Sequence, residues 1–181
     1  EEFLKQYDQK PTPIDYRSSL PFEGGLSKAR KRLKYYFWDN NFLDSYKKTR
    51  NQLFGQDYSS KFSPWLANGC ISPRRIRSEV KRYEETYKPN QSTYWLVFEL
   101  IWRDYFKFIA IQHGSCIFHK KGVKRKIVPS HQNKTLFEEW KKGETSDAFV
   151  NANMRELLNT GYMSNRGRQN VASYLIHDLG I

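Results

Sequence analysis

The chain has 181 residues, enough for one domain with its own hydrophobic core. Its 31 Lys and Arg against 19 Asp and Glu give a formal net charge of +12. This charge favours a polyanionic partner, most simply nucleic acid, over a surface that only keeps the protein soluble. Cys70, Cys116 and the scattered histidines form no disulfide framework and show no metal-ligand spacing, and we expect reduced thiols in a cytoplasmic or other reducing intracellular compartment. No apolar run is long enough for a membrane span.

The elements follow one another as helices, and no segment shows the alternation of a strand. Prolines and glycines interrupt the first residues, so we interpret 1–23 as the remnant of an interdomain linker and 24–181 as the domain. Ser72 followed by Pro73 is typical of a helix start, and Gly143 and Gly161 are typical of helix ends. The sequence therefore predicts an all-α fold, with helices at about 27–38, 73–87, 91–112, 134–142, 146–159 and 165–178.

The longest predicted helix, 91–112, is apolar on most of its circumference, so we expect it to be central and buried. Trp95, Glu99, Trp102, Arg103 and Phe106 fall on one of its faces by helical spacing. A carboxylate and a guanidinium are costly to bury unless they are paired or bind a ligand, and the two indoles form a wall suited to stacking on a base or a flavin. The alternative is a structural Glu–Arg pair lined by core aromatics.

Two polar segments could hold an anion. In residues 58–66, hydroxyls, backbone N–H groups and Lys61 precede a helix, which suits a phosphate, although serine-rich helix caps are common. In residues 160–170, Gly161 ends one helix and two arginines and two amides fill the first turns of the next. There the positive helix end favours a phosphate or a polar heterocycle, and the alternative is a solvated helix start.

Taken in order, these segments make the chain similar to the photolyase/cryptochrome family, and among its branches to cryptochrome DASH. The resemblance covers about residues 20–181. The segments that carry it are Gly24-Gly25, Tyr46-Lys47-Lys48-Thr49-Arg50-Asn51, Ser59-Ser60-Lys61-Phe62-Ser63-Pro64-Trp65-Leu66 continuing through 67–74, Tyr94-Trp95 with Phe98-Glu99-Leu100-Ile101-Trp102-Arg103-Asp104-Tyr105-Phe106, and Asn153-Met154-Arg155-Glu156-Leu157 with 160–181.

This resemblance implies the multi-helical FAD-binding domain, truncated at its C-terminal end, of a deoxyribodipyrimidine photo-lyase type of enzyme. In the parent protein, light-excited reduced FAD would split cyclobutane pyrimidine dimers in damaged, single-stranded DNA, and an antenna pigment would bind a preceding α/β domain. The family continues after Ile181 with a segment that grips the isoalloxazine ring. We therefore expect this chain alone to bind FAD weakly or not at all and to be inactive. The alternatives are a blue-light photoreceptor and a truncated nucleic-acid-binding module without flavin.

The resemblance also implies roles for single residues. The Glu99 carboxyl would hydrogen-bond the thymine edge of the dimer, the Trp102 indole would stack on it, and Arg103 would lie between flavin and DNA. With Asn165, Glu99 and Trp102 form the expected catalytic set. The expected FAD contacts are Tyr46, Ser59, Ser60, Lys61, Phe62, Ser63, Arg103, Asn165 and Arg168. The expected nucleic-acid contacts are Trp95, Glu99, Trp102, Tyr162, Arg166 and Gln169.

Overall fold

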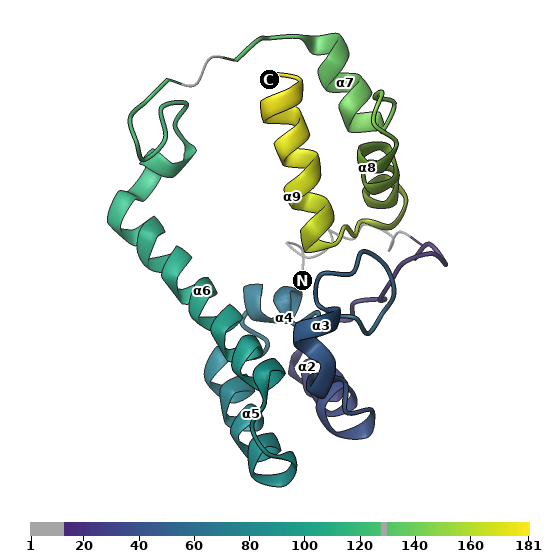
Figure 1. Cartoon of the computed structure of the whole chain (residues 1–181), viewed down its shortest axis with the longest axis vertical. Helices are drawn as coiled ribbons and strands as arrows, with labels where there is room; N and C mark the ends of the chain where they lie inside the picture. Colours follow the sequence, from purple (N-terminus) through teal and green to yellow (C-terminus); the bar gives the residue numbers. More distant parts are fainter. Residues whose placement is uncertain (1–12, 128–129) are drawn as a thin grey trace, which may run out of the picture.

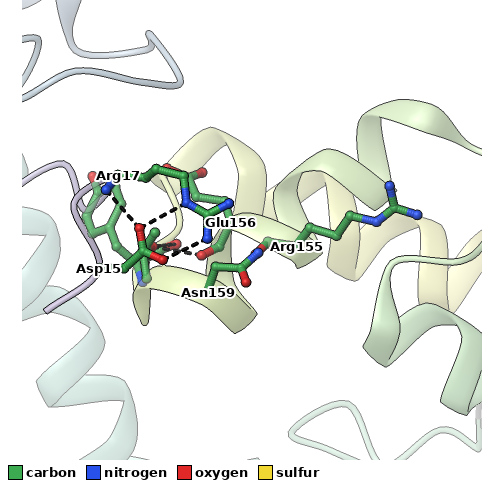
Figure 2. A network of polar contacts seen from close by, with 7 residues as sticks. Asp15, Arg17, Arg155, Glu156 and Asn159 are labelled. Atoms are coloured by element: carbon green, nitrogen blue, oxygen red, sulfur yellow. Dashed lines mark hydrogen bonds and ion pairs between the residues drawn. The ribbon is translucent and has the colours of Figure 1, made fainter. Parts of the chain in front are cut away.

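A computed structural model describes residues 13–127 and 130–181 (Figure 1). All regular elements of this described part are helical, which confirms the expected all-α class. Residues 1–12 of the expected linker lie outside the described part. In the remainder of that linker, the Arg17 side chain donates to both carboxylate oxygens of Asp15. Figure 2 shows this pair in front of helix α8, whose Arg155 and Glu156 are labelled.

The first group of helices surrounds an aromatic core. It contains α2 (Leu26–Lys34), α3 (Tyr46–Thr49), α4 (Ser63–Ala67), α5 (Pro73–Tyr87) and the first half of α6 (Gln91–His113). Helix α2 buries Ala29 and Leu33 and continues as a π turn, Tyr35–Asp39, that carries Phe37 into the same core. This burial of large aromatic rings is the main stabilisation of the group.

Capping residues fix where the two longest helices begin. The Ser72 hydroxyl accepts a hydrogen bond from the Arg75 N–H at 3.1 Å, and Pro73 occupies the first turn of α5. The Asn90 side chain accepts from the N–H groups of Ser92 and Thr93 and forms a capping box at the start of α6. These caps satisfy N–H groups that have no partner within the helix, which explains why the starts could be predicted from sequence.

The expectation of a buried α6 is wrong for its second half. Ser92, Thr93, Leu96 and Leu100 are buried where α6 packs against α3 and α5. Beyond Leu100 most of the large apolar side chains are exposed, and Figure 1 shows this half of α6 leading away from α3 and α5. The residues concerned are Ile101, Tyr105, Phe106, Phe108 and Ile111. The spacing of apolar residues shows that the helix is apolar on most of its circumference. Burial also needs a neighbouring element, and α6 extends beyond the helices that pack against its first half.

The second group contains α7 (Lys134–Lys142), α8 (Ala148–Thr160) and α9 (Asn165–Ser173), which continues as a π turn at Tyr174–Asp178. Its small core consists of Val150, Met154, Met163 and Val171. Gly143 and Gly161 end α7 and α8 in the left-handed conformation, with φ of 68° and 69°, as the sequence predicts.

Candidate functional site

A cleft of about 570 Å³ lies where the two groups of helices meet. Its lining contains Phe22, Tyr46, Arg50, Tyr58, Ser59, Ser60, Lys61, Phe62, Ser63, Pro64, Glu99, Gly161, Tyr162, Met163, Asn165 and Arg168. A second hollow of about 360 Å³ shares Tyr46, Ser60, Phe62, Ser63 and Glu99 with it and extends to Leu100 and Arg103. Together these hollows are lined by all of the residues expected to contact FAD.

The loop 59–63 lines the cleft and contains backbone donors that have no partner in the described part of the chain. Within the described part of the chain, the N–H groups of residues 59–63 have no hydrogen-bond acceptor. Lys61 has a left-handed backbone, with φ of 55°, although it carries a side chain. Such a turn costs energy for a residue other than glycine and gathers successive N–H groups into a concave surface that suits an anion.

Lys61 joins the two groups of helices through a pair of tyrosines. Its ammonium donates to the Tyr162 hydroxyl at 2.7 Å, and the hydroxyls of Tyr58 and Tyr162 are 2.5 Å apart. The ammonium also lies 4.0 and 4.2 Å from the centres of the two rings. Burial lowers the pKa of Lys61 to about 8, and burial raises the pKa of both tyrosines above the ordinary value.

The Glu99 carboxylate, which α6 contributes to the cleft, is held by two donors. Arg50 Nη1 donates to Glu99 Oε1 at 2.6 Å, and Trp95 Nε1 donates to the same oxygen at 3.1 Å. Lys47 places its ammonium 3.6 Å from the centre of the Trp95 ring. The Glu99 side chain is one-third exposed, so its second oxygen can still accept from a ligand.

Trp102 follows Glu99 on α6 but is absent from the lining of both hollows. The residue is 42% exposed, and its indole stacks on the Phe106 ring at an interplanar angle of 27°, with 5.6 Å between the centroids. Arg103 lines the smaller hollow and pairs with Asp104 at 3.3 Å. Trp95 is also absent from both linings, so the two indoles flank the hollows and the stacking wall stays a prediction.

The start of α9 divides its polar residues between the cleft and the surface. The buried Ser164 accepts from the Gly167 N–H at 2.9 Å, and this cap fixes Asn165 and Arg168 at the cleft. Arg166 points elsewhere and donates to Gln169 and, at 3.2 Å, to Asn51.

Two polar residues that hold the cleft together, Arg50 and Tyr58, have no individual role in the sequence-based assignment. Arg50 lies inside the segment 46–51 that carries the family resemblance, one helical turn after Tyr46, and this spacing could have placed both on one face. Tyr58 begins the segment 58–66 that suits a phosphate, but no local pattern signals its contact with Tyr162, because the two residues are far apart in sequence.

Within residues 13–127 and 130–181, no three His, Cys, Asp or Glu side chains cluster as a metal site requires. No helix of this described part combines the length and the apolarity that crossing a membrane needs.

Comparisons with known proteins identify the class to which this cleft belongs. Residues 95–181 match the FAD binding domain of DNA photolyase. A cryptochrome from Synechocystis sp. superposes with a TM-score of 0.92 at 53% identity, over 94% of this chain and 35% of its own. A photolyase from Sulfolobus tokodaii, solved with two FAD molecules, superposes with a TM-score of 0.60 at 26% identity, over 97% of this chain and 35% of its own. The chain belongs to the photolyase/cryptochrome family and carries part of its helical FAD-binding domain.

Within the family, the chain falls in the DASH branch. It is 53% identical to cryptochrome DASH of Xenopus laevis over 98% of this chain and 34% of that protein. It is 56% identical to cryptochrome DASH of Danio rerio over 92% of this chain and 32% of that protein. The chain thus spans about a third of the length of these relatives.

Proposed function

We propose that this chain forms one wall of the flavin and DNA site of a DASH-type cryptochrome. We further propose that the parent protein uses light to split cyclobutane pyrimidine dimers in single-stranded DNA. The observation that best supports the proposal is the position of Glu99. Its carboxylate, held by Arg50 and Trp95, faces the same cleft as the loop 59–63, so a dimer and a flavin would be neighbours there.

The residues of the cleft fit the chemistry of FAD. The unpaired N–H groups of the loop 59–63 and the nearby Lys61 ammonium suit a diphosphate. Tyr46, Phe62 and Leu100 offer apolar surface in the adjoining hollow, and Asn165 and Arg168 add polar donors from α9. A bound flavin would supply the light-driven electron transfer, while the protein supplies binding and orientation.

On this proposal, each side chain near Glu99 has a distinct task. Arg50 and Trp95 fix the carboxylate so that its free oxygen can accept a hydrogen bond from the thymine edge. The exposed Trp102 indole offers a face on which an extruded base can stack. Arg166, which is exposed, would contact a DNA phosphate.

An absorption spectrum of the purified 181-residue chain is the first test. We expect weak or no FAD binding, because the cleft adjoins a half of α6 whose large apolar side chains are exposed to solvent. The parent protein should show a stoichiometric flavin band. Stoichiometric FAD in the 181-residue chain would contradict the first expectation, and a parent protein without flavin would contradict the proposed function.

Repair of a pyrimidine dimer in a single-stranded oligonucleotide then separates an enzyme from a photoreceptor. In the parent protein, Glu99→Ala should lower the light-dependent repair rate by roughly 100-fold while FAD stays bound, because the dimer loses a charged hydrogen-bond partner. Glu85→Ala removes an exposed carboxylate from α5 and serves as the control. Equal loss of FAD and repair in Glu99→Ala would show instead that Glu99 is structural.

A further inference from the structure

Arg32 lies behind the loop 56–60 and binds its backbone. It belongs to α2, and only 5% of its surface is exposed. Its Nε donates to the Ser60 carbonyl oxygen at 3.1 Å, and its Nη2 donates to the carbonyl oxygens of Gln56 at 3.0 Å and Ser59 at 3.1 Å. One guanidinium therefore holds three backbone carbonyls of the loop that precedes α4.

The guanidinium of Arg32 is itself held in place, and its charge is neutralised by the Asp57 carboxylate. Its Nη1 donates to Asp57 Oδ1 at 2.9 Å, and the other Asp57 oxygen accepts from the Tyr35 hydroxyl at 3.1 Å. The guanidinium carbon lies 5.3 and 5.2 Å from the ring centres of Tyr35 and Tyr36. Arg32 is also absent from the lining of the cleft of about 570 Å³. These contacts leave it poorly placed to bind an anion there directly.

Its effect on the cleft follows from the geometry of the peptide bond. All peptide bonds of the described residues are trans, so each C=O points away from the N–H of the next residue. The carbonyls of Ser59 and Ser60 point to Arg32, and the N–H groups of Ser60 and Lys61 therefore point to the other side. Both residues line the cleft, and within the described chain neither N–H has an acceptor.

We infer that Arg32 is a positioning residue, which turns the N–H groups of Ser60 and Lys61 into the cleft to bind a diphosphate. The inference deepens the proposed function and rests on it for the identity of the ligand, the diphosphate of the flavin. A planar fork with several donors is needed to hold three carbonyls together, so a lysine cannot replace the arginine although it keeps the charge.

The test compares Arg32→Lys with the unsubstituted 181-residue chain by NMR of the backbone amides. We expect the Ser60 and Lys61 amide resonances to move in the ligand-free variant, and its affinity for inorganic pyrophosphate to fall roughly tenfold or more. Arg30→Lys, an exposed arginine on the same helix, is the matched control and should change neither. Unchanged resonances and unchanged pyrophosphate affinity in Arg32→Lys would overturn the inference.

A second variant separates positioning from a general loss of stability. Leu33→Ala creates a cavity beside Arg32 on α2 but leaves the guanidinium and its carbonyl partners in place. It should lower the melting temperature while keeping both the loop resonances and the pyrophosphate affinity, and an equal loss of affinity would refute the inference. If the unsubstituted chain binds no pyrophosphate and the parent protein no FAD, the proposed function fails, and the ligand-free amide resonances still decide the role of Arg32.

Discussion

The Lys61 ammonium is buried between two tyrosine rings, where its charge has little solvent to stabilise it. Arg32 adds like-charge repulsion, while Glu156 and Asp57 partly offset it from a distance. A phosphate anion in the cleft would supply the missing opposite charge. The left-handed backbone of Lys61 and the burial that lowers its pKa therefore have a common consequence. Both place a cation and unpaired N–H groups next to each other in the cleft, where an anion can bind.

This arrangement predicts a dependence of stability on pH. The pKa of Lys61 falls from 10.5 to about 8 on folding, so between these values the unfolded chain binds more protons than the folded one. The free energy of unfolding contributed by this group therefore rises with pH in that window. Relative to Lys61→Met, the unsubstituted chain should gain about 2 kcal/mol between pH 7 and 9.5.

Urea unfolding at the two pH values measures this difference. Lys48→Met removes an exposed lysine from α3 and controls for the loss of one positive charge. If the difference between Lys61→Met and the unsubstituted chain stays constant with pH, then Lys61 is not buried as a cation in solution.

At the scale of elements, Gly167 sets how closely α8 and α9 approach. A Cβ at this position would overlap the Asn153 Oδ1 atom and lie 3.0 Å from Met163 Cγ. In most helices Gly→Ala is stabilising by up to about 1 kcal/mol, because alanine has the higher helix propensity. Here the overlap should dominate, because the Asn153 side chain is buried and bonded to the Phe149 carbonyl oxygen and would have to shift to make room.

We therefore predict that Gly167→Ala lowers the free energy of unfolding by about 1–3 kcal/mol. Chemical denaturation measures the change, and Gly24→Ala, which adds a methyl group in open space, is the control and should be nearly neutral. A stabilised Gly167→Ala variant would mean that α8 and α9 are further apart than described.

Helix α6 shows that the bounds of a helix can be predicted from sequence while its burial cannot. Its bounds follow from the Asn90 cap and from Gly114, and both signals lie within a few residues of the helix ends. Its burial does not follow from such signals. The same apolar pattern is packed at Leu96 and Leu100 and exposed at Phe108 and Ile111, because only the first half has α3 and α5 beside it.

At the scale of the whole molecule, the net charge of +12 predicts binding to single-stranded DNA that weakens with salt. Fluorescence anisotropy with a labelled oligonucleotide should show a linear fall of log affinity with log salt concentration. Arg166→Gln should lower the magnitude of this slope by about 1 if Arg166 contacts a phosphate. The control is Arg77→Gln, an exposed arginine on α5. A flat salt response would contradict the prediction, and equal effects of both variants would indicate bulk charge alone.

The sequence by itself determined the all-α class, the helix bounds and the family, because caps, glycines and motifs are encoded within a few residues of one another. It also identified Glu99 and the loop 59–63 as candidate site residues. Only the tertiary structure decided that Arg50 holds Glu99 and that Tyr58 meets Tyr162 across the cleft. The same is true of the contacts through which Arg32 holds the loop 56–60. Such contacts depend on the path of the chain between distant residues and on hydrogen-bond geometry, which no local pattern contains.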